Sequence, residues 1–190
     1  PSHASNHAWR RNKGAKKVYV HAFLDGRDVQ PGSALKYIAE IEEYMNEIGL
    51  GKIATICGRY YAMDRDKRWE RVELAYNAMV LSKGEKDTSA LEAVKKAMND
   101  NKTDEFVLPT VIMENNKPVA AISNNDTVIC FNFRPDRARE LTRAINDKVF
   151  DGFKRETLKL NYVCTTQYDL SIENVDVAYT PESYTNTLGE

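Results

Sequence analysis

The feature that most constrains the fold is a set of three apolar runs that each stop at a cluster of charged residues. The runs are KVYVHAFL (17–24), KIATIC (52–57) and TVICFNF (127–133), and they end at DGRD, GR and RPDR. Nearly continuous apolar runs of this length, rich in β-branched and aromatic residues, are typical of strands that are covered on both faces. The sequence therefore predicts a sheet buried between helices, with charged side chains gathered where the strands end.

The segments between these runs have the spacing of helices. Apolar residues follow helical spacing in 34–48, where Gly49 supplies a natural stop, and again in 69–81. The sequence SALE (89–92) fits a capping box in front of a short helix that runs to residue 98.

Two further features concern the sheet. Segments 106–113 and 119–122 flank the turn sequence NNKP, which predicts an antiparallel hairpin, and 158–165 reads as a last strand. A hairpin makes an all-parallel sheet implausible. The order of elements therefore predicts an α/β layered fold with a mixed, mostly parallel β-sheet flanked by helices.

Length and charge limit the classes of protein that this chain can belong to. Its 190 residues are 42% hydrophobic and 29% charged, which suits one domain with a sizeable core. The formal net charge of −1 argues against a general binder of nucleic acid or of an anionic membrane. We interpret residues 13–190 as a single domain. Residues 1–12 are a polar, poorly defined N-terminal segment with two open origins, a non-native vector remnant or a rebuilt terminus.

The cysteines point to a compartment rather than to a site. Cys57, Cys130 and Cys164 are odd in number and far apart, so neither a zinc spacing nor a disulfide framework follows from them. Each lies in or beside an apolar run, which favours buried free thiols in a reducing compartment. We also find no bilayer-spanning apolar stretch and no signal peptide. A cytoplasmic location is the expectation.

The charged clusters are the candidate functional site. If the strands run parallel, their carboxyl ends lie at one edge, where open α/β sheets bind ligands. Five arginines would then converge there: Arg27, Arg59, Arg65, Arg134 and Arg137. The guanidinium fork binds phosphate and carboxylate in two-pronged fashion, so a small ligand that carries both groups fits best. Asp28 would accept a hydrogen bond from a ligand hydroxyl or hold one arginine in place. Taken singly, each cluster is better explained as a solvated loop, and it is their repetition at three strand ends that favours a binding site.

The RPDR sequence adds a more specific expectation. Proline is favoured in the first turn of a helix, so Pro135 predicts a helix that continues to about residue 144. Arg134 would then lie at the entry and Arg137 about one turn further on. The unpaired N–H groups of the first turn would add donors for an anion.

Three stretches also resemble a known family. KKVYVHAFLDGRDVQP (16–31), GRYYAMDRDKRWERVELAYNA (58–78) and FNFRPDRARELTRA (131–144) are similar to signatures of cofactor-independent (2,3-bisphosphoglycerate-independent) phosphoglycerate mutases. NTLGE at 186–190 resembles the hinge by which that family's chain leaves this domain. The similarity runs from about residue 13 to residue 190.

The resemblance implies a two-domain enzyme that interconverts 3-phosphoglycerate and 2-phosphoglycerate in glycolysis. A phosphatase-like domain would hold two divalent metals, manganese in many members, and a serine that forms a phosphoserine intermediate. The present chain would be the inserted domain that binds the glycerate. By match to the motifs, the substrate-binding residues are Arg27, Asp28, Arg59, Arg65, Arg134 and Arg137. Arg134 and Arg137 are the candidates for the phosphoryl group.

Several parts of such an enzyme have no counterpart in this sequence. The only histidines are His3, His7 and His21, and no Asp/His spacing indicates a two-metal centre. No serine lies in a recognisable nucleophile setting. We therefore expect no catalytic residue and no bound metal in this chain, which alone would be inactive. We assign no role to His3 or His7, and we interpret His21, which lies in a strand pattern, as a packed core histidine.

Two other functions fit parts of the sequence. One is a stand-alone module that binds small anions, phosphate or carboxylate, without catalysis. The other is a nucleic-acid binder, against which the near-neutral charge and the lack of interleaved aromatic residues in the basic motifs both count. The main hypothesis is the substrate-binding domain, with the phosphatase-like domain of the same chain and a phosphoglycerate as its partners.

Overall fold

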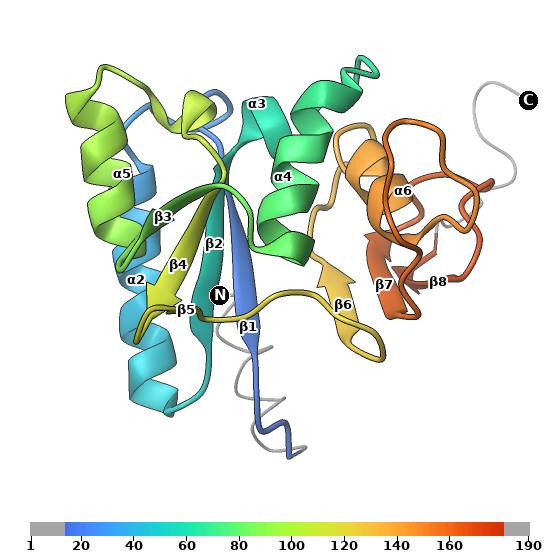
Figure 1. Cartoon of the computed structure of the whole chain (residues 1–190), viewed down its shortest axis with the longest axis horizontal. Helices are drawn as coiled ribbons and strands as arrows, with labels where there is room; N and C mark the ends of the chain where they lie inside the picture. Colours follow the sequence, from blue (N-terminus) through green and yellow to red (C-terminus); the bar gives the residue numbers. More distant parts are fainter. Residues whose placement is uncertain (1–13, 181–190) are drawn as a thin grey trace, which may run out of the picture.

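Two β-sheets organise the chain in the computed structural model, which describes residues 14–180 (Figure 1). The first sheet has the strand order β1-β2-β4-β3, with β5 paired to β4. Its strands are β1 (Tyr19–Leu24), β2 (Lys52–Gly58), β3 (Glu85–Asp87), β4 (Thr110–Glu114) and β5 (Lys117–Pro118). The second sheet has the order β6-β7-β8, with β6 (Thr127–Cys130), β7 (Asn161–Thr166) and β8 (Val175–Tyr179).

Helices cover both faces of the first sheet, and the last of them lies beside the second sheet (Figure 1). They are α2 (Ala34–Ile48), α3 (Arg59–Ala62), α4 (Trp69–Leu81), α5 (Ala90–Asn99) and α6 (Arg139–Asn146), together with the short 3-10 helix η1 (Asp104–Phe106). Helices α2 and α5 lie side by side against one face, whereas α4 lies between the two sheets (Figure 1). This arrangement confirms the predicted α/β layered fold with mixed strands flanked by helices. The strands form two sheets rather than the one expected, of which the first is mixed and the second is parallel.

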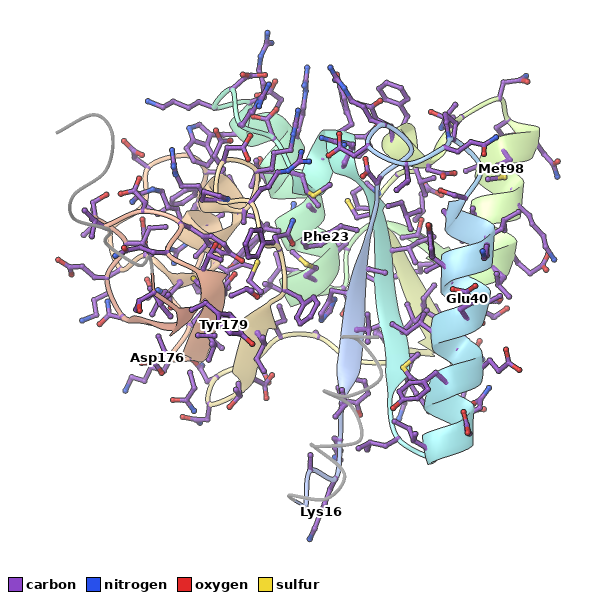
Figure 2. The ribbon with its side chains drawn as sticks, turned by 180° about the vertical axis from the view of Figure 1, so that it is seen from behind. Lys16, Phe23, Glu40, Met98, Asp176 and Tyr179 are labelled. Atoms are coloured by element: carbon purple, nitrogen blue, oxygen red, sulfur yellow. The ribbon has the colours of Figure 1, made fainter. Side chains whose placement is uncertain are left out.

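The buried side chains form two clusters, one on each face of β2. Ile56 belongs to the cluster beneath α2 and α5, and its neighbour Cys57 belongs to the cluster that α4 shares with α6 and the second sheet. Phe23 of β1 packs against this second cluster, on the side that faces the second sheet (Figure 2). Alternate residues of one strand thus enter different cores, which is why its sequence is mostly apolar on both faces.

The pairing of the strands shows which of them are parallel and which are antiparallel, a distinction that the sequence did not provide. Among the described residues β1–β2, β3–β4, β6–β7 and β7–β8 are parallel, whereas β2–β4 and β4–β5 are antiparallel. The predicted hairpin is confirmed but short, with its turn at Asn115 and Asn116, both at positive φ. Residues 106–109, which we included in its first strand, instead lie outside β4 and partly in η1. The predicted second strand, 119–122, is also wrong, because β5 consists of Lys117 and Pro118, which we had placed in the turn.

The start of α6 differs from the prediction. The helix begins at Arg139 and not at Pro135. The N–H groups of Ala138 and Arg139 both donate to the carbonyl of Pro135 at 3.2 Å, so residues 135–138 form a turn before the helix. Arg137 therefore lies on this turn and Arg134 directly before it, and the idea that they flank the first turn of a helix is wrong.

Several expectations about single residues can now be checked. Half of the predicted capping box is present, because the Ser89 hydroxyl accepts a hydrogen bond from the N–H of Glu92 at 3.4 Å. The Ser89 N–H donates to Asp87 at 3.2 Å and not to the side chain of Glu92. Cys57 and Cys164 are buried free thiols, whereas Cys130 is half-buried. Burial raises the pKa of Cys164 to about 12. Within residues 14–180, no helix is long and apolar enough to cross a bilayer.

Two interpretations fall on residues that the structure does not describe. These are the poorly defined segment 1–12, with His3 and His7, and the hinge-like sequence 186–190. Both stay predictions.

Gly58 is the point where the first sheet meets η1. A Cβ at this position would collide with the backbone carbonyl of Glu105, and the Gly58 N–H donates to the carbonyl of Val107 at 2.8 Å. Only a residue without a side chain allows β2 to end this close to another backbone segment.

We expect Gly58→Ala to lower the free energy of unfolding by about 3 kcal/mol, the upper end for overpacking, because the obstacle is backbone and cannot rotate away. Gly49→Ala is the control, since a Cβ at Gly49 meets nothing within 4 Å and only its φ of 64° adds strain. Urea denaturation of both variants measures the difference. Equal losses would show that η1 gives way at little cost.

His21 packs within the sheet, as expected. It is half-buried, and its Nδ1 lies 2.8 Å from the Thr55 hydroxyl on the neighbouring strand. Burial lowers its pKa from the ordinary 6.5 to about 4. Between those pH values His21 is protonated in the unfolded chain but not in the folded chain, so the free energy of unfolding falls as pH falls.

The free energy of unfolding should therefore drop by up to about 1.4 kcal/mol for each pH unit across this window because of His21 alone. Denaturation of the wild-type chain and of His21→Gln, at about pH 7 and about pH 5, tests this. The variant should lose less stability between the two conditions. An equal loss in both proteins would exclude His21 as the group responsible.

Candidate functional site: an arginine and aspartate cluster

The site is built where β1 and β2 end side by side. The two strands are parallel, and Leu24 lies opposite Gly58 in their register, so the residues that follow each strand meet at one edge. Arg59 is only 3% exposed, and its guanidinium forms ion pairs with Asp25 and, at 3.5 Å, with Asp28. A buried guanidinium is costly to desolvate unless carboxylates surround it, and the DGRD turn supplies two of them.

Asp25 is the functional residue that our sequence reasoning missed. Its Oδ1 accepts hydrogen bonds from the N–H groups of Arg27 at 3.1 Å and Asp28 at 3.2 Å, besides pairing with Arg59. Partial burial by itself would raise the pKa of Asp25, but these N–H groups and the Arg59 guanidinium together lower it. The signal was present, because an aspartate that begins a glycine-containing turn commonly accepts bonds from the backbone that follows it.

Asp28 connects the two sheets. Its Oδ2 accepts a hydrogen bond from Nη1 of Arg134 at 2.9 Å, while its Oδ1 faces Arg59. Arg134 follows β6, which belongs to the second sheet. The charged ends of strands from different sheets thus converge, although β6 is not hydrogen-bonded to β1 or β2.

Arg65, Asp136 and Arg137 form the other side of the cluster. Arg65 pairs with Asp136 at 2.8 Å, and Arg137 donates to the carbonyl of Met63 at 2.8 Å. Burial lowers the pKa of Arg137, and the positive charges of Arg59, Arg65 and Arg27 lower it further. These arginines therefore lie close enough to repel one another, which is the condition that a bound anion would relieve.

Arg27 is the loosest member of the set. Its side chain is 63% exposed and lies 4.0 Å from the carboxylate of Glu105. All six residues that the sequence singled out, Arg27, Asp28, Arg59, Arg65, Arg134 and Arg137, thus lie in or beside one cluster. Their side chains differ in availability, since Arg59 is buried while Arg65 and Arg134 are 51% and 74% exposed.

A metal has no evident place in this part of the protein. Among residues 14–180, no group of three or more His, Cys, Asp or Glu side chains is arranged to hold a metal ion. The carboxylates of the cluster are instead engaged by arginines. The chemistry that this arrangement supports is the binding of an anion, with Asp28 as the acceptor for a hydroxyl group.

Comparison with known proteins identifies the family. Residues 4–170 match the family described as BPG-independent PGAM N-terminus. The chain belongs to this family. The family's name states that its phosphoglycerate mutases work without bisphosphoglycerate, which confirms the resemblance seen in the three motifs.

Individual relatives agree with this assignment. The chain is 70% identical over 177 residues to the 2,3-bisphosphoglycerate-independent phosphoglycerate mutase of Clostridium novyi, which covers 93% of this chain and 35% of the relative. It is 68% identical over 180 residues to the enzyme of the same name from Clostridium botulinum, covering 95% and 35%. A crystal structure of Leishmania mexicana phosphoglycerate mutase at low cobalt concentration superposes with a TM-score of 0.90 at 34% identity. That match covers 96% of this chain and 35% of the other. The chain thus spans about a third of the length of the proteins it matches.

The buried and exposed ion pairs of the cluster should differ sharply in their contribution to stability. We expect Asp25→Asn to lower the free energy of unfolding by about 3 kcal/mol, because it leaves the buried Arg59 with Asp28 as its one remaining carboxylate partner among residues 14–180. Asp136→Asn removes a pair whose side chains are both about half exposed, and should cost no more than about 1 kcal/mol. Urea denaturation of the two variants measures both. A larger loss for Asp136→Asn would contradict the central place given to Arg59.

Proposed function

We propose that this chain is the substrate-binding domain of a phosphoglycerate mutase that interconverts 3-phosphoglycerate and 2-phosphoglycerate in glycolysis. The observation that carries the proposal is the arginine and aspartate cluster, found in a member of the BPG-independent family. A phosphoglycerate carries a phosphate, a carboxylate and a hydroxyl. Arginine forks suit the first two groups, and the Asp28 carboxylate suits the third.

The solvent exposure of each arginine and its existing ion pairs indicate which role it has in binding the substrate. Arg59 is already paired with Asp25 and Asp28, so its task is to hold these two carboxylates in place. Arg65 and Arg134 are largely exposed, and they can turn towards a ligand. Arg134 and Arg137 remain the candidates for the phosphoryl group, while Arg27, Arg65 and Asp28 grip the glycerate.

The reaction needs such a grip. The phosphoryl group leaves one glycerate oxygen for a serine oxygen of the enzyme and returns to the other glycerate hydroxyl. Between these two transfers the free glycerate must stay bound and be reoriented. Because phosphoryl transfer depends mainly on positioning and charge neutralisation, several fixed arginines around the glycerate serve both needs.

The rest of the enzyme must supply the remaining parts. In this proposal the serine and two divalent metals, manganese among the candidates, belong to a phosphatase-like domain of the same polypeptide, and the metals would neutralise phosphate charge there. Arg27, Arg65 and Arg134 are more than half exposed, so a ligand held by them would stay open to water unless another domain covered it. We also propose a cytoplasmic location, where the three free cysteines would stay reduced.

Arg65→Ala in the full-length enzyme is the sharpest test. Arg65 is half exposed and pairs only with the exposed Asp136 among the described residues, so its loss should leave the fold intact. We expect kcat/KM for 3-phosphoglycerate to fall by about a hundredfold or more, since water cannot replace the charge in a closed site.

The matched control is Lys36→Ala, which removes an exposed cation on α2 that pairs with Glu40 at 3.8 Å. It should leave kcat/KM unchanged. Near-normal turnover of Arg65→Ala would show that the cluster is not the substrate site. An unmodified full-length enzyme without mutase activity would overturn the proposed reaction itself.

A further inference from the structure

The short helix η1 borders the arginine cluster, where its Glu105 lies 4.0 Å from Arg27, and it contacts both of the strand ends that build the cluster. Its first residue, Asp104, is 1% exposed, and no cation of residues 14–180 forms an ion pair with it. Burial of a carboxylate without a paired cation costs desolvation free energy, which its hydrogen bonds must offset. Those bonds lead directly to the loop that bears Asp28.

Asp104 holds the far end of this loop. Its Oδ2 accepts hydrogen bonds from the N–H groups of Gly32 at 3.0 Å and Ala34 at 3.1 Å. Ser33, the residue before α2, makes no capping bond with its own side chain. Asp104 therefore caps α2 from a distant part of the chain, and the partial positive charge of the helix N-terminus helps to stabilise the carboxylate.

The same residue also limits the near end of the loop. Gly26 has a φ of 72°, and a Cβ there would lie 2.9 Å from the Cβ of Asp104. The loop thus touches Asp104 just after Asp25 and again at Gly32, and Asp28 lies between the two contacts. The other oxygen of Asp104, Oδ1, has no hydrogen-bond partner among the described residues, so both bonds depend on Oδ2.

The residues that follow Asp104 reach the second strand end. The carbonyl of Glu105 lies against Gly58, and the carbonyl of Val107 accepts the Gly58 N–H at 2.8 Å. Gly58 directly precedes Arg59. One segment, 104–107, therefore contacts the loop of Asp28 on one side and the backbone next to Arg59 on the other.

We propose that Asp104 is a positioning residue that sets where Asp28 lies between Arg59 and Arg134, and so controls how the cluster grips its substrate. The proposal rests on the proposed function of the cluster. Asp104 acts through the loop backbone and does not itself touch the ligand. Removal of the Asp104 carboxylate would leave the loop free to shift and so misplace Asp28. Misplacement of a substrate-binding group by about 1 Å can lower the rate a hundredfold.

The test is made in the full-length enzyme with 3-phosphoglycerate as substrate. Asp104→Ala removes both hydrogen bonds, and we expect kcat/KM to fall by about tenfold or more. Asp104→Asn keeps an acceptor oxygen at the same place, and it should recover most of that loss. An Asp104→Ala enzyme that is folded and within about twofold of the wild type would overturn the proposal.

A double-mutant cycle separates positioning from general damage. If Asp104 works through Asp28, then adding Asp104→Ala to Asp28→Asn should cost less than about twofold further in kcat/KM. Losses that simply multiply would overturn the proposal, because they would mean that the two residues act independently.

Met45→Ala is the matched control for stability. Met45 is buried near the other end of α2, and its truncation weakens the same helix without touching the loop. It should lower the melting temperature at least as much as Asp104→Ala and keep kcat/KM within about twofold. A comparable loss of kcat/KM in Met45→Ala would reduce the Asp104 effect to destabilisation. An inactive wild type would instead overturn the proposed function, and this inference with it.

Discussion

The buried guanidinium of Arg59 is the interaction on which the rest of the site depends. A cation that is 3% exposed needs carboxylates beside it, and only the DGRD turn after β1 can bring Asp25 and Asp28 to that place. The parallel pairing of β1 and β2, with Leu24 opposite Gly58, puts the two chain segments at the same height. The ion pairs therefore join the end of one strand to the end of the next. The abrupt change from apolar to charged residues in the sequence marks this junction.

Asp28 is the shared element between the two sheets. Because it faces Arg59 on one side and Arg134 on the other, an anion that binds Arg134 must compete with Asp28 for the guanidinium. Competition of this kind favours a ligand that also donates a hydrogen bond to Asp28, which replaces the bond that Asp28 loses from Arg134. A hydroxyl group donates a hydrogen bond to a carboxylate, so a hydroxylated phosphocarboxylic acid satisfies both partners where simple phosphate satisfies one.

Aspartates that never face solvent support this arrangement from behind. Asp104 fixes the loop of Asp28, and Asp64, which is 5% exposed, accepts bonds from the N–H groups of Asp66 and Arg68 at 2.9 Å each. The second set shapes the segment that carries Arg65. Exposed arginines would sample many positions if their backbone were free to move. Buried carboxylates bonded to the backbone reduce that freedom, which is how a polar cluster on a surface can still be selective.

Local sequence patterns determined the long elements of this protein. The strands β1 and β2 and the helices α2, α4 and α5 follow from apolar spacing, glycine stops and one capping box, because each signal lies within a few residues of its effect. The charged residues at the strand ends, and their likeness to one family, also came from the sequence alone. Tertiary structure decided the rest. The short elements β3 and α3 have too few residues to show a period, and β8 was overlooked although VDVAY alternates. The division into two sheets, the late start of α6, the burial of Arg59 and the contact of Asp104 with a loop some seventy residues earlier all depend on which segments meet in space. No local pattern encodes such meetings, because hydrogen bonds and ion pairs between distant segments exist only once the cores on both faces of β2 have formed.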